Sequence, residues 1–335
     1  MRKIFAIITI SILCLSGTLV IANYVDELDQ YQTEMTENIF LLVGQFTIFE
    51  NPLYLQTAQS FIPTKDILTR VELYIGKNST TTYPYVLSIK DNLTHEDLTT
   101  ISLDPEDIPT GDFGWVEFDF DDISVVTGQT YYIVSYTENI TDNWYAIAAN
   151  NISESYPYGC VWISLDDGDS WSNESYESMF IETNNNQVGQ KRFEDMYTWD
   201  LCFKTYGREN NAPGNVNILG PVKGKPNTKY DYVLNATDPN GDNIRFFVDF
   251  GDGDTIWTDY TTSGTSVIVS HSWAKKGNYI IKVLAQDEYG AEGPESTLDM
   301  AIPKNKPIDK PIFKILSNQP YIFMILMHIL LKFGL

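Results

Sequence analysis

Short runs of alternating apolar and polar residues dominate the first two thirds of the chain. Between residues 38 and 208 the clearest runs are Ile39–Phe49, Leu68–Ile75, Tyr85–Ile89, Trp115–Phe120 and Tyr131–Tyr136. A period of two is typical of strands that bury one face. Proline and glycine separate the runs, and no helical period extends far enough to indicate an α/β fold. The pattern predicts an all-β, jelly-roll-like antiparallel sandwich over residues 38–208.

A second set of strands follows a linker that opens with Asn211, Ala212 and Pro213. Its runs are Tyr230–Thr237, Ile244–Phe250, Val267–Trp273 and Tyr279–Gln286. Turns rich in Asp, Asn, Gly and Lys lie between them. This spacing predicts a second antiparallel β-sandwich, of immunoglobulin-like type, over residues 211–303.

Both ends of the chain have a different pattern. Arg2 and Lys3 precede an apolar run, residues 4–22, that ends at the small residue Ala22. This layout is typical of a secretory signal peptide at residues 1–22, and an uncleaved signal anchor is the alternative, since the run is close to the length of a membrane span. Residues 304–335 join a basic, proline-rich linker to a short apolar C-terminal helix, which is too short for a simple span. Membrane association would use residues 4–22 or the 321–335 tail.

The charge balance excludes nucleic acid as a partner. The chain has 22 Lys+Arg against 45 Asp+Glu, a net charge of −23, and a phosphate binder needs a basic face. At 43% hydrophobic residues the chain still has enough apolar material for folded cores. Six N-x-S/T sequons fit export and predict glycosylation at Asn78, Asn92, Asn139, Asn151, Asn173 and Asn235. We therefore expect an extracytoplasmic protein, secreted or held at the cell surface.

No motif of a known catalytic mechanism occurs in the sequence. It contains no nucleophile elbow, no H-E-x-x-H motif and no P-loop, and its three histidines are His95, His271 and His328. With 45 acids, carboxylate pairs are easy to find and therefore uninformative. We expect no enzymatic activity. The alternative from another class is a secreted glycan hydrolase or its accessory subunit.

Two residue pairs are candidates for specific contacts. Cys160 and Cys202 would remain after removal of a signal peptide, and outside the cell they predict one disulfide; two separately buried thiols are the alternative. Trp144 and Tyr145 follow a polar loop and are expected to form an exposed platform that stacks on a glycan. No basic residue lies nearby, which favours a neutral glycan. The alternative is that these aromatic side chains belong to the core.

Oxygen-bearing side chains gather at one predicted end of the second sandwich. Asp238, Asn240 and Asp242 alternate in one loop, Asp287 begins another, and Asn211 starts the domain at the same end. Alternating oxygen ligands are typical of calcium loops, and carboxylates gathered without Lys or Arg repel one another unless a cation joins them. These five residues form the candidate calcium site, and no other cofactor is expected. A plain turn fixed by its own amides is the alternative.

One short motif has a known structural role. Ser164, Asp166, Gly168 and Trp171 fit the pattern S-x-D-x-G-x-[ST]-W, which resembles the Asp-box of sialidases and related propellers. A propeller needs one copy per blade, whereas this chain has a single copy. We expect a structural hairpin turn, in which Asp166 caps turn amides, Gly168 takes a positive φ and Trp171 plugs the core. No sialidase activity is implied.

The second sandwich resembles the PKD domain. The resemblance rests on the Asp249–Gly253 turn (DFGDG), the HSW segment at His271–Trp273, Tyr279, and the following Ile281–Asp287 strand, with Val248 where the family often has Trp. PKD modules are spacers and binding units on surface proteins and secreted hydrolases. The resemblance implies an immunoglobulin-like fold without a catalytic role.

The first sandwich resembles a domain of archaeal surface proteins that join a jelly-roll-like β-sandwich to a PKD module. The matching segments are residues 58–75, 115–120, 126–137 and 200–207. The resemblance implies a non-enzymatic surface protein for binding or adhesion, with cell-surface glycans or proteins as partners. A structural component of the cell envelope is a further alternative.

Overall fold

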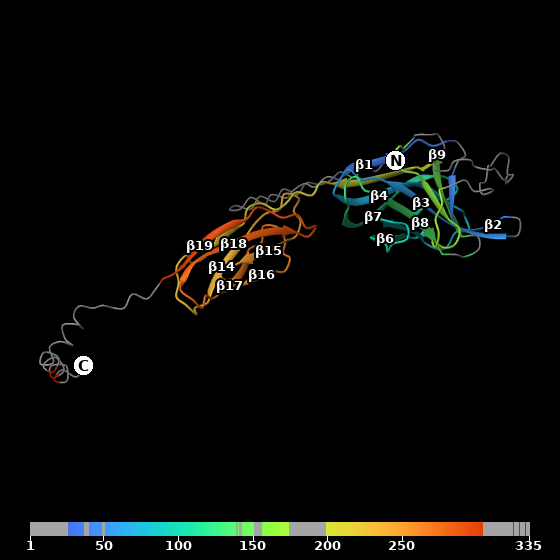
Figure 1. Ribbon diagram of the computed structural model, residues 1–335. Helices are drawn as coiled ribbons and strands as arrows, with labels where there is room; N and C mark the ends of the chain where they lie inside the picture. The colour runs from blue at the N-terminus through green and yellow to red at the C-terminus, as the bar shows by residue number, and fades with distance from the viewer. Residues whose placement is uncertain are drawn as a thin grey trace, which may run out of the picture. The chain divides into compact units, whose positions relative to one another are not determined.

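The structure is a computed structural model that describes residues 26–36, 40–48, 51–138, 140, 143–150, 156–173 and 199–303, together with Met324, His328 and Lys332, which are helical. The chain divides into two units between Asn210 and Asn211. Strands form almost all of the regular secondary structure of the described residues (Figure 1). The predicted segment 1–22 and most of the predicted tail helix lie outside the described residues. Within the described ranges, no helix combines the length and hydrophobicity needed to cross a membrane.

The first unit contains twelve strands and one short 3-10 helix. The strands are β1 (Glu27–Gln32), β2 (Phe40–Ile48), β3 (Asn51–Phe61), β4 (Ile67–Lys77), β5 (Tyr85–Lys90), β6 (Thr99–Leu103), β7 (Gly114–Ser124), β8 (Tyr131–Thr137), β9 (Trp144–Asn150), β10 (Val161–Ser164), β11 (Asp200–Leu201) and β12 (Phe203–Arg208). The 3-10 helix η1 spans Pro105–Asp107. All strand pairings in this unit are antiparallel.

The strands form two layers that share β3. One layer contains β1, β12, β4, β7, β9 and β2, and the other contains β10, β8, β5 and β6. β3 pairs with β2 through Asn51–Leu55 and with β8 and β10 through Gln56–Phe61. The predicted sandwich is therefore present, but its sheets are continuous, whereas a simple jelly roll has two separate sheets.

The core of the first unit lies between these layers. Tyr85 on β5 contacts Phe118 on β7 and Tyr145 on β9, with ring centroids 5.4 and 5.0 Å apart. All three side chains are fully buried. The alternating inward positions of β4 and β7 supply Val71, Leu73 and further apolar side chains to the same cluster, which is the burial that a period of two predicts.

The first unit begins earlier than the sequence pattern predicts. β1 pairs with β12 outside the expected 38–208 range, with Leu28 opposite Tyr206 and Tyr31 opposite Lys204. Most β1 side chains are polar, and Leu28 and Tyr31 are exposed. Hydrophobic alternation does not reveal such an edge strand, because backbone pairing with β12 and polar contacts, such as Lys65 with Glu27 and Tyr156 with Gln30, hold it in place.

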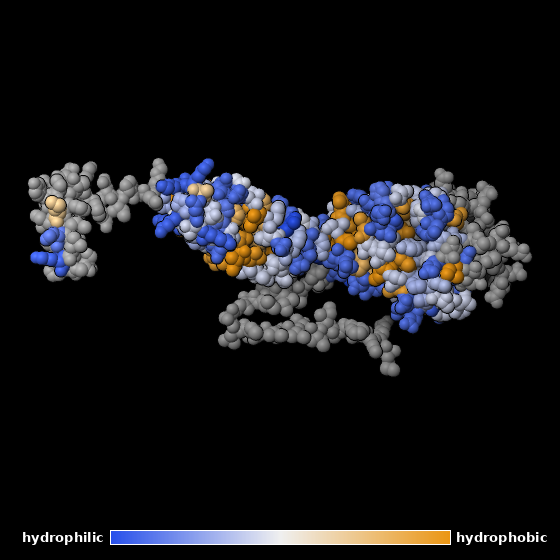
Figure 2. All heavy atoms as spheres, turned by 90° about the horizontal axis from the view of Figure 1, so that it is seen from below, coloured by the Kyte–Doolittle hydropathy of each residue, from blue (hydrophilic) through white to orange (hydrophobic). Residues whose placement is uncertain are grey.

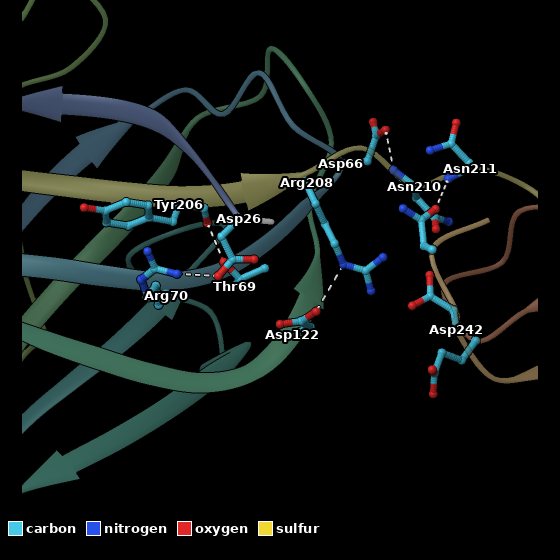
Figure 3. Close-up of polar contacts among 12 residues, drawn as sticks. Asp26, Asp66, Thr69, Arg70, Asp122, Tyr206, Arg208, Asn210, Asn211 and Asp242 are labelled. Atoms are coloured by element: carbon cyan, nitrogen blue, oxygen red, sulfur yellow. Dashed lines mark hydrogen bonds and ion pairs between the residues drawn. The ribbon is translucent and has the colours of Figure 1, made fainter. Parts of the chain in front are cut away.

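Ion pairs and polar contacts hold the neighbouring strand ends of this unit together (Figure 3). Arg70 on β4 pairs with Asp26, and its guanidinium lies 3.8 Å from the ring centroid of Tyr206 on β12. Arg208, at the end of β12, pairs with Asp122 on β7 at 3.2 Å. The amide of Asn210 donates to Asp66 at 3.3 Å. Arg70 and Arg208 thus each form an ion pair with an aspartate of this acidic unit.

The second unit is a seven-stranded sandwich. Its strands are β13 (Asn217–Leu219), β14 (Tyr230–Asn235), β15 (Ile244–Asp249), β16 (Thr255–Trp257), β17 (Val267–His271), β18 (Gly277–Asp287) and β19 (Ser296–Ile302). One sheet has the order β13-β14-β17 and the other β16-β15-β18-β19. This arrangement confirms the immunoglobulin-like sandwich. Apolar side chains also reach the surface of both units among hydrophilic ones (Figure 2).

Trp273 is the largest fully buried side chain of the second unit. Its indole N–H donates to the carbonyl of Phe250 at 3.1 Å, and its ring packs edge-on against Tyr232. Val248, where the PKD pattern often has Trp, is fully buried in the same core. The Phe250 contact joins the core to the turn between β15 and β16, so the conformation of that turn and the packing of Trp273 depend on each other.

Two glycines of this turn provide a matched test. Gly251 has φ +76°, and a Cβ there would lie 2.6 Å from the carbonyl oxygen of Ile280; Gly253 has φ +103° with open space around its Cα. We predict that Gly253→Ala destabilises the unit by about 1–2 kcal/mol, the cost of a left-handed alanine, and that Gly251→Ala costs clearly more because it adds a backbone clash. Chemical denaturation of fragment 209–303 measures both. Equal losses would contradict the clash.

Candidate metal centre

Three aspartates meet at one end of the second unit. Asp238 and Asp242 lie in the loop between β14 and β15, and Asp287 is the last residue of β18. Ligand oxygens from the three carboxylates all lie within 4.8 Å of one another. The three side chains are buried, with exposed fractions of 6%, 8% and 0%. Buried negative charges at this separation repel one another strongly unless a cation or a proton joins them.

Each loop uses one carboxylate oxygen to fix its own backbone. Asp238 Oδ1 accepts from the amides of Asn240 and Asp242 at 2.8 and 3.2 Å. Asp287 Oδ1 accepts from the amides of Tyr289 and Ala291 at 3.0 and 2.8 Å. Side chains that cap their own turns in this way are typical of Asp in loops. The turns therefore hold the two carboxylates in fixed orientations before any ligand arrives.

The second oxygen of Asp238 is the unusual atom of the cluster. Asp238 Oδ2 is buried and has no hydrogen-bond partner among the described residues. Burial raises the pKa of the Asp238 carboxyl; the amides of Asp242 and Asn240 oppose this shift, and the charges of Asp242 and Asp287 add to it. A buried carboxylate oxygen without a partner is costly. A divalent cation bound by the three carboxylates would remove that cost.

Asn211 and Asn240, the other two predicted ligands, contact each other. Asn240 Oδ1 accepts from the backbone amide of Asn211 at 2.7 Å (Figure 3). The contact fastens the first residue of the unit to the loop that carries Asp238 and Asp242. The structure therefore brings three of the five predicted residues together as a carboxylate cluster and gives the two asparagines a positioning contact.

A second acidic group lies at the opposite end of β15. Asp252 and Asp254 belong to the β15–β16 turn, and ligand atoms of both lie within 4.8 Å of an imidazole nitrogen of His271. Asp252 is already engaged: Oδ2 pairs with His271 Nε2 at 2.9 Å and Oδ1 accepts from the Asp254 amide. The His271 ring stacks on Phe250 with centroids 4.1 Å apart. These contacts describe a structural turn.

The predicted stacking platform at Trp144 and Tyr145 is wrong. Tyr145 is fully buried, and its hydroxyl donates to the carbonyl of Tyr83 at 2.6 Å. Trp144 is half-buried against the main core. The reason is the position of β9, which lies between β4 and β2 and is therefore an interior strand. The predicted alternative, that these aromatic side chains belong to the core, is correct for Tyr145, and Trp144 packs against that core while remaining partly exposed.

The predicted disulfide is also wrong, because Cys160 and Cys202 are free thiols. Cys160 precedes β10, where its carbonyl accepts from the amide and hydroxyl of Ser60. Cys202 lies between β11 and β12, is 1% exposed, and its thiol contacts the carbonyl of Glu34 at 3.3 Å. Burial raises the pKa of the Cys202 thiol to about 12. The two sulfur atoms thus have different neighbours and act as buried or half-buried structural groups.

The Asp-box forms the expected turn. Asp166 Oδ1 accepts from the amide of Ser170 at 2.8 Å, and Ser164 Oγ accepts from the amide of Gly168 at 2.9 Å. Asp167 and Gly168 have φ of 62° and 88°, as the two central residues of a type I′ turn require. Trp171, however, does not plug the main core. It packs on the outer face of the β3–β8 layer, beside Ala58, Leu93 and Val134, and helps to line a pocket that the sequence does not reveal.

The predicted glycosylation sites are only partly within the described residues. Asn139 and Asn151 lie outside them. Asn92 is exposed, and Asn78, Asn173 and Asn235 are half-buried. The Asn235 amide group already donates to the carbonyl of Gly264 at 2.6 Å. Glycosylation at all six sequons stays a prediction.

Comparisons with known proteins address the second unit most directly. The family model of the PKD domain matches residues 210–302. The PKD domain of an M14-like peptidase from Thermoplasmatales archaeon SCGC AB-540-F20 is 42% identical, and the match covers 28% of this chain and 99% of that one, with a TM-score of 0.28. The PKD1 domain of Vibrio anguillarum Epp is 22% identical over 28% of this chain and 100% of that one, with a TM-score of 0.21.

A third solved structure covers more of the chain at lower identity. The fibronectin(III)-like modules of Clostridium thermocellum CbhA are 13% identical over 79% of this chain and 94% of that one, with a TM-score of 0.24. No curated protein matches this chain. The family model and the 42% identity both fall on the second unit. The chain therefore belongs to the proteins that carry a PKD domain, and residues 210–302 are that domain.

Proposed function

We propose that the protein is a non-enzymatic, extracytoplasmic surface protein that serves binding or adhesion, and that its PKD domain is a calcium-binding spacer. The observation that carries this proposal is the buried cluster of Asp238, Asp242 and Asp287, in which Asp238 Oδ2 has no hydrogen-bond partner among the described residues. A fold that only needed stability would gain by replacing one of these charges with a neutral side chain. A bound cation that neutralises the three carboxylates would explain why these charges are present.

Calcium fits the cluster better than other common cations. All the candidate ligand atoms are carboxylate oxygens, which suit hard cations, whereas zinc prefers nitrogen and sulfur ligands. Magnesium keeps most of its water shell and demands a small octahedral site, while calcium accepts irregular oxygen cages. Calcium sites of extracellular modules have dissociation constants of about 10⁻⁴–10⁻³ M. An affinity in that range suits a protein outside the cell.

The location has independent support. PKD domains usually occur in extracellular proteins, and the matching family model spans residues 210–302, which include all the strands of the second unit. The six sequons and the apolar residues 4–22 agree with export. Protease treatment of intact cells tests the location: we expect cleavage of the exposed sandwiches without lysis. Purified protein should adhere to cell-surface preparations and release no reducing sugar from polysaccharides. The proposal would be contradicted if the protein resisted the protease until the cells were lysed, or if it released reducing sugar.

Asp238→Asn should separate metal binding from folding. The amide keeps the oxygen that accepts from Asn240 and Asp242, and it removes the buried charge. In chelator we expect fragment 209–303 with Asp238→Asn to melt at or above the wild-type temperature. Calcium at tenfold above its dissociation constant should stabilise the wild type by about 1.4 kcal/mol, at roughly 4–8 °C per kcal/mol for a domain of this size, and should barely shift the variant.

The matched control for that experiment is Asp299→Asn. Asp299 is an exposed carboxylate on β19, so its substitution removes the same charge from the same domain without touching the cluster. Calcium should shift this variant as it shifts the wild type. An equal calcium shift in Asp238→Asn and Asp299→Asn, or no shift in the wild type, would contradict the metal site.

The raised pKa of Asp238 also gives a pH dependence. Between the unfolded pKa of about 3.9 and the raised folded pKa, the folded state holds more protons than the unfolded state, so stability falls as pH rises through this window. In chelator, we expect the stability advantage of Asp238→Asn over the wild type to be absent below pH ~4 and to grow as pH rises. Thermal melts of both proteins from acid to neutral pH measure it. A pH-independent difference would contradict the buried charge, and excess calcium at neutral pH should abolish the difference.

A further inference from the structure

Two loops and one sheet face enclose a pocket in the first unit. The pocket has a volume of about 270 Å³ and lies on the outer face of the layer formed by β10, β3, β8 and β5. Gln56 on β3 and Tyr136 on β8 come from the sheet. Lys90 and Asp97 come from the end of β5 and the loop that follows it. Asp167 and Trp171 come from the Asp-box turn.

Apolar packing explains why the loops fold over this face. Ala58 and Val134 point outward from β3 and β8 and are at most 1% exposed. Leu93, from the loop after β5, covers them together with Trp171. The sheet therefore has a small second core on its outer side. The pocket lies beside this core, so its walls are held by packing as well as by hydrogen bonds.

The polar groups of the pocket form donor–acceptor pairs. Lys90 Nζ lies 2.9 Å from Asp97 Oδ1, and Gln56 Nε2 donates to Asp167 Oδ1 at 2.8 Å. Gln56 is 7% exposed, so its amide is fixed. Each pair places a donor next to an acceptor, which is the arrangement that neighbouring hydroxyl groups of a sugar can bridge. Asp167 reaches this position because the turn holds its backbone at φ 62°.

The phenol of Tyr136 is the remaining polar group. It has no hydrogen-bond partner within the part of the chain that the structure describes. Burial raises the pKa of the Tyr136 hydroxyl, and the charge of Asp97 adds to the shift. The hydroxyl is therefore neutral across the physiological range and can donate or accept. Its ring and the indole of Trp171 supply aromatic surface on two sides of the pocket.

We propose that this pocket binds the terminal sugar of a neutral glycan. The inference deepens the proposed function and rests on it, since it names the ligand class of the binding protein. Pockets for drug-sized ligands measure about 300–1,000 Å³, so a volume of about 270 Å³ suits one sugar ring with the rest of the chain outside. Aromatic side chains contact the apolar C–H faces of such a ring, and the polar pairs contact its hydroxyls.

Charge distinguishes this ligand from the other candidates. The lining contains one Lys and two Asp, a net charge of 1 − 2 = −1, so an acidic sugar or a phosphate would be repelled. A cationic side chain would have to compete with Lys90 for Asp97 and with Gln56 for Asp167. An uncharged polyol can use the donors and the acceptors without separating these pairs.

A glycan array with the full chain tests the proposal. The array carries neutral glucose, galactose, mannose and N-acetylglucosamine oligosaccharides, with sialylated and sulfated glycans and a lysine-rich peptide as comparison probes. We expect binding to at least one neutral probe. Tyr136→Ala should weaken it by at least about tenfold through lost stacking and hydrogen bonding. Tyr136→Phe removes only the hydroxyl and should weaken it about three- to tenfold, which keeps the test valid if Tyr136→Ala fails to fold.

Trp115→Ala is the matched control. Trp115 is an aromatic residue on β7 with 38% of its surface exposed, in the other layer of the sandwich, and its substitution should leave binding unchanged. If both Tyr136 variants still bound neutral glycans, the glycan site would lie outside this pocket, and the proposed binding function would still stand. Binding only to acidic glycans or to the peptide would overturn the ligand class, and so would adhesion to cell-surface proteins with no bound glycan. Absence of surface exposure and of all adhesion would instead reject the proposed function.

Discussion

The first sandwich depends on the pairing of one strand, β3, in both of its layers. Its first residues bond to β2 and its last residues to β8 and β10. A slip of one residue would exchange the two faces of the strand and move Phe61 out of the core. The fully buried amide of Gln59 helps to prevent such a slip, because it bonds to Asp200 at 3.0 Å and to the amide of Leu201 at 2.7 Å. The same strand places Gln56 in the pocket, so both the core and the pocket depend on the register of β3.

Alternation in the sequence predicts the strands that bury one face and fails where other forces decide. It predicts β4, β7, β8, β14, β15 and β18 because inward residues such as Val71 and Phe246 recur at every second position. It misses β1, whose polar residues are held by backbone pairing with β12. Tyr145 is predicted to be exposed because it follows a polar loop, whereas neighbours on both sides make β9 an interior strand.

The two candidate sites also differ in whether the sequence predicts them. The carboxylate cluster is predictable because Asp238 and Asp242 are close in sequence and the immunoglobulin-like order brings Asp287 to the same end. The pocket is not predictable, because it needs Gln56, Asp97 and Asp167 from three distant segments. The Asp-box is visible as a turn, but the surface that its Trp171 covers depends on Leu93, from a loop with no recognisable motif.

The acid excess of the chain leads to different chemistry at the two sites because the carboxylates are compensated differently. In the pocket, Lys90 forms an ion pair with Asp97, and the side-chain amide of Gln56 donates to Asp167, so both carboxylates have partners within the fold. In the PKD domain the turn amides satisfy Asp238 Oδ1, whereas Oδ2 is buried with no partner from the described parts of the chain. Hydrogen bonds from amides stabilise a carboxylate but do not cancel its charge. Compensation within the fold therefore favours a neutral ligand at the first site, and its absence favours a cation at the second.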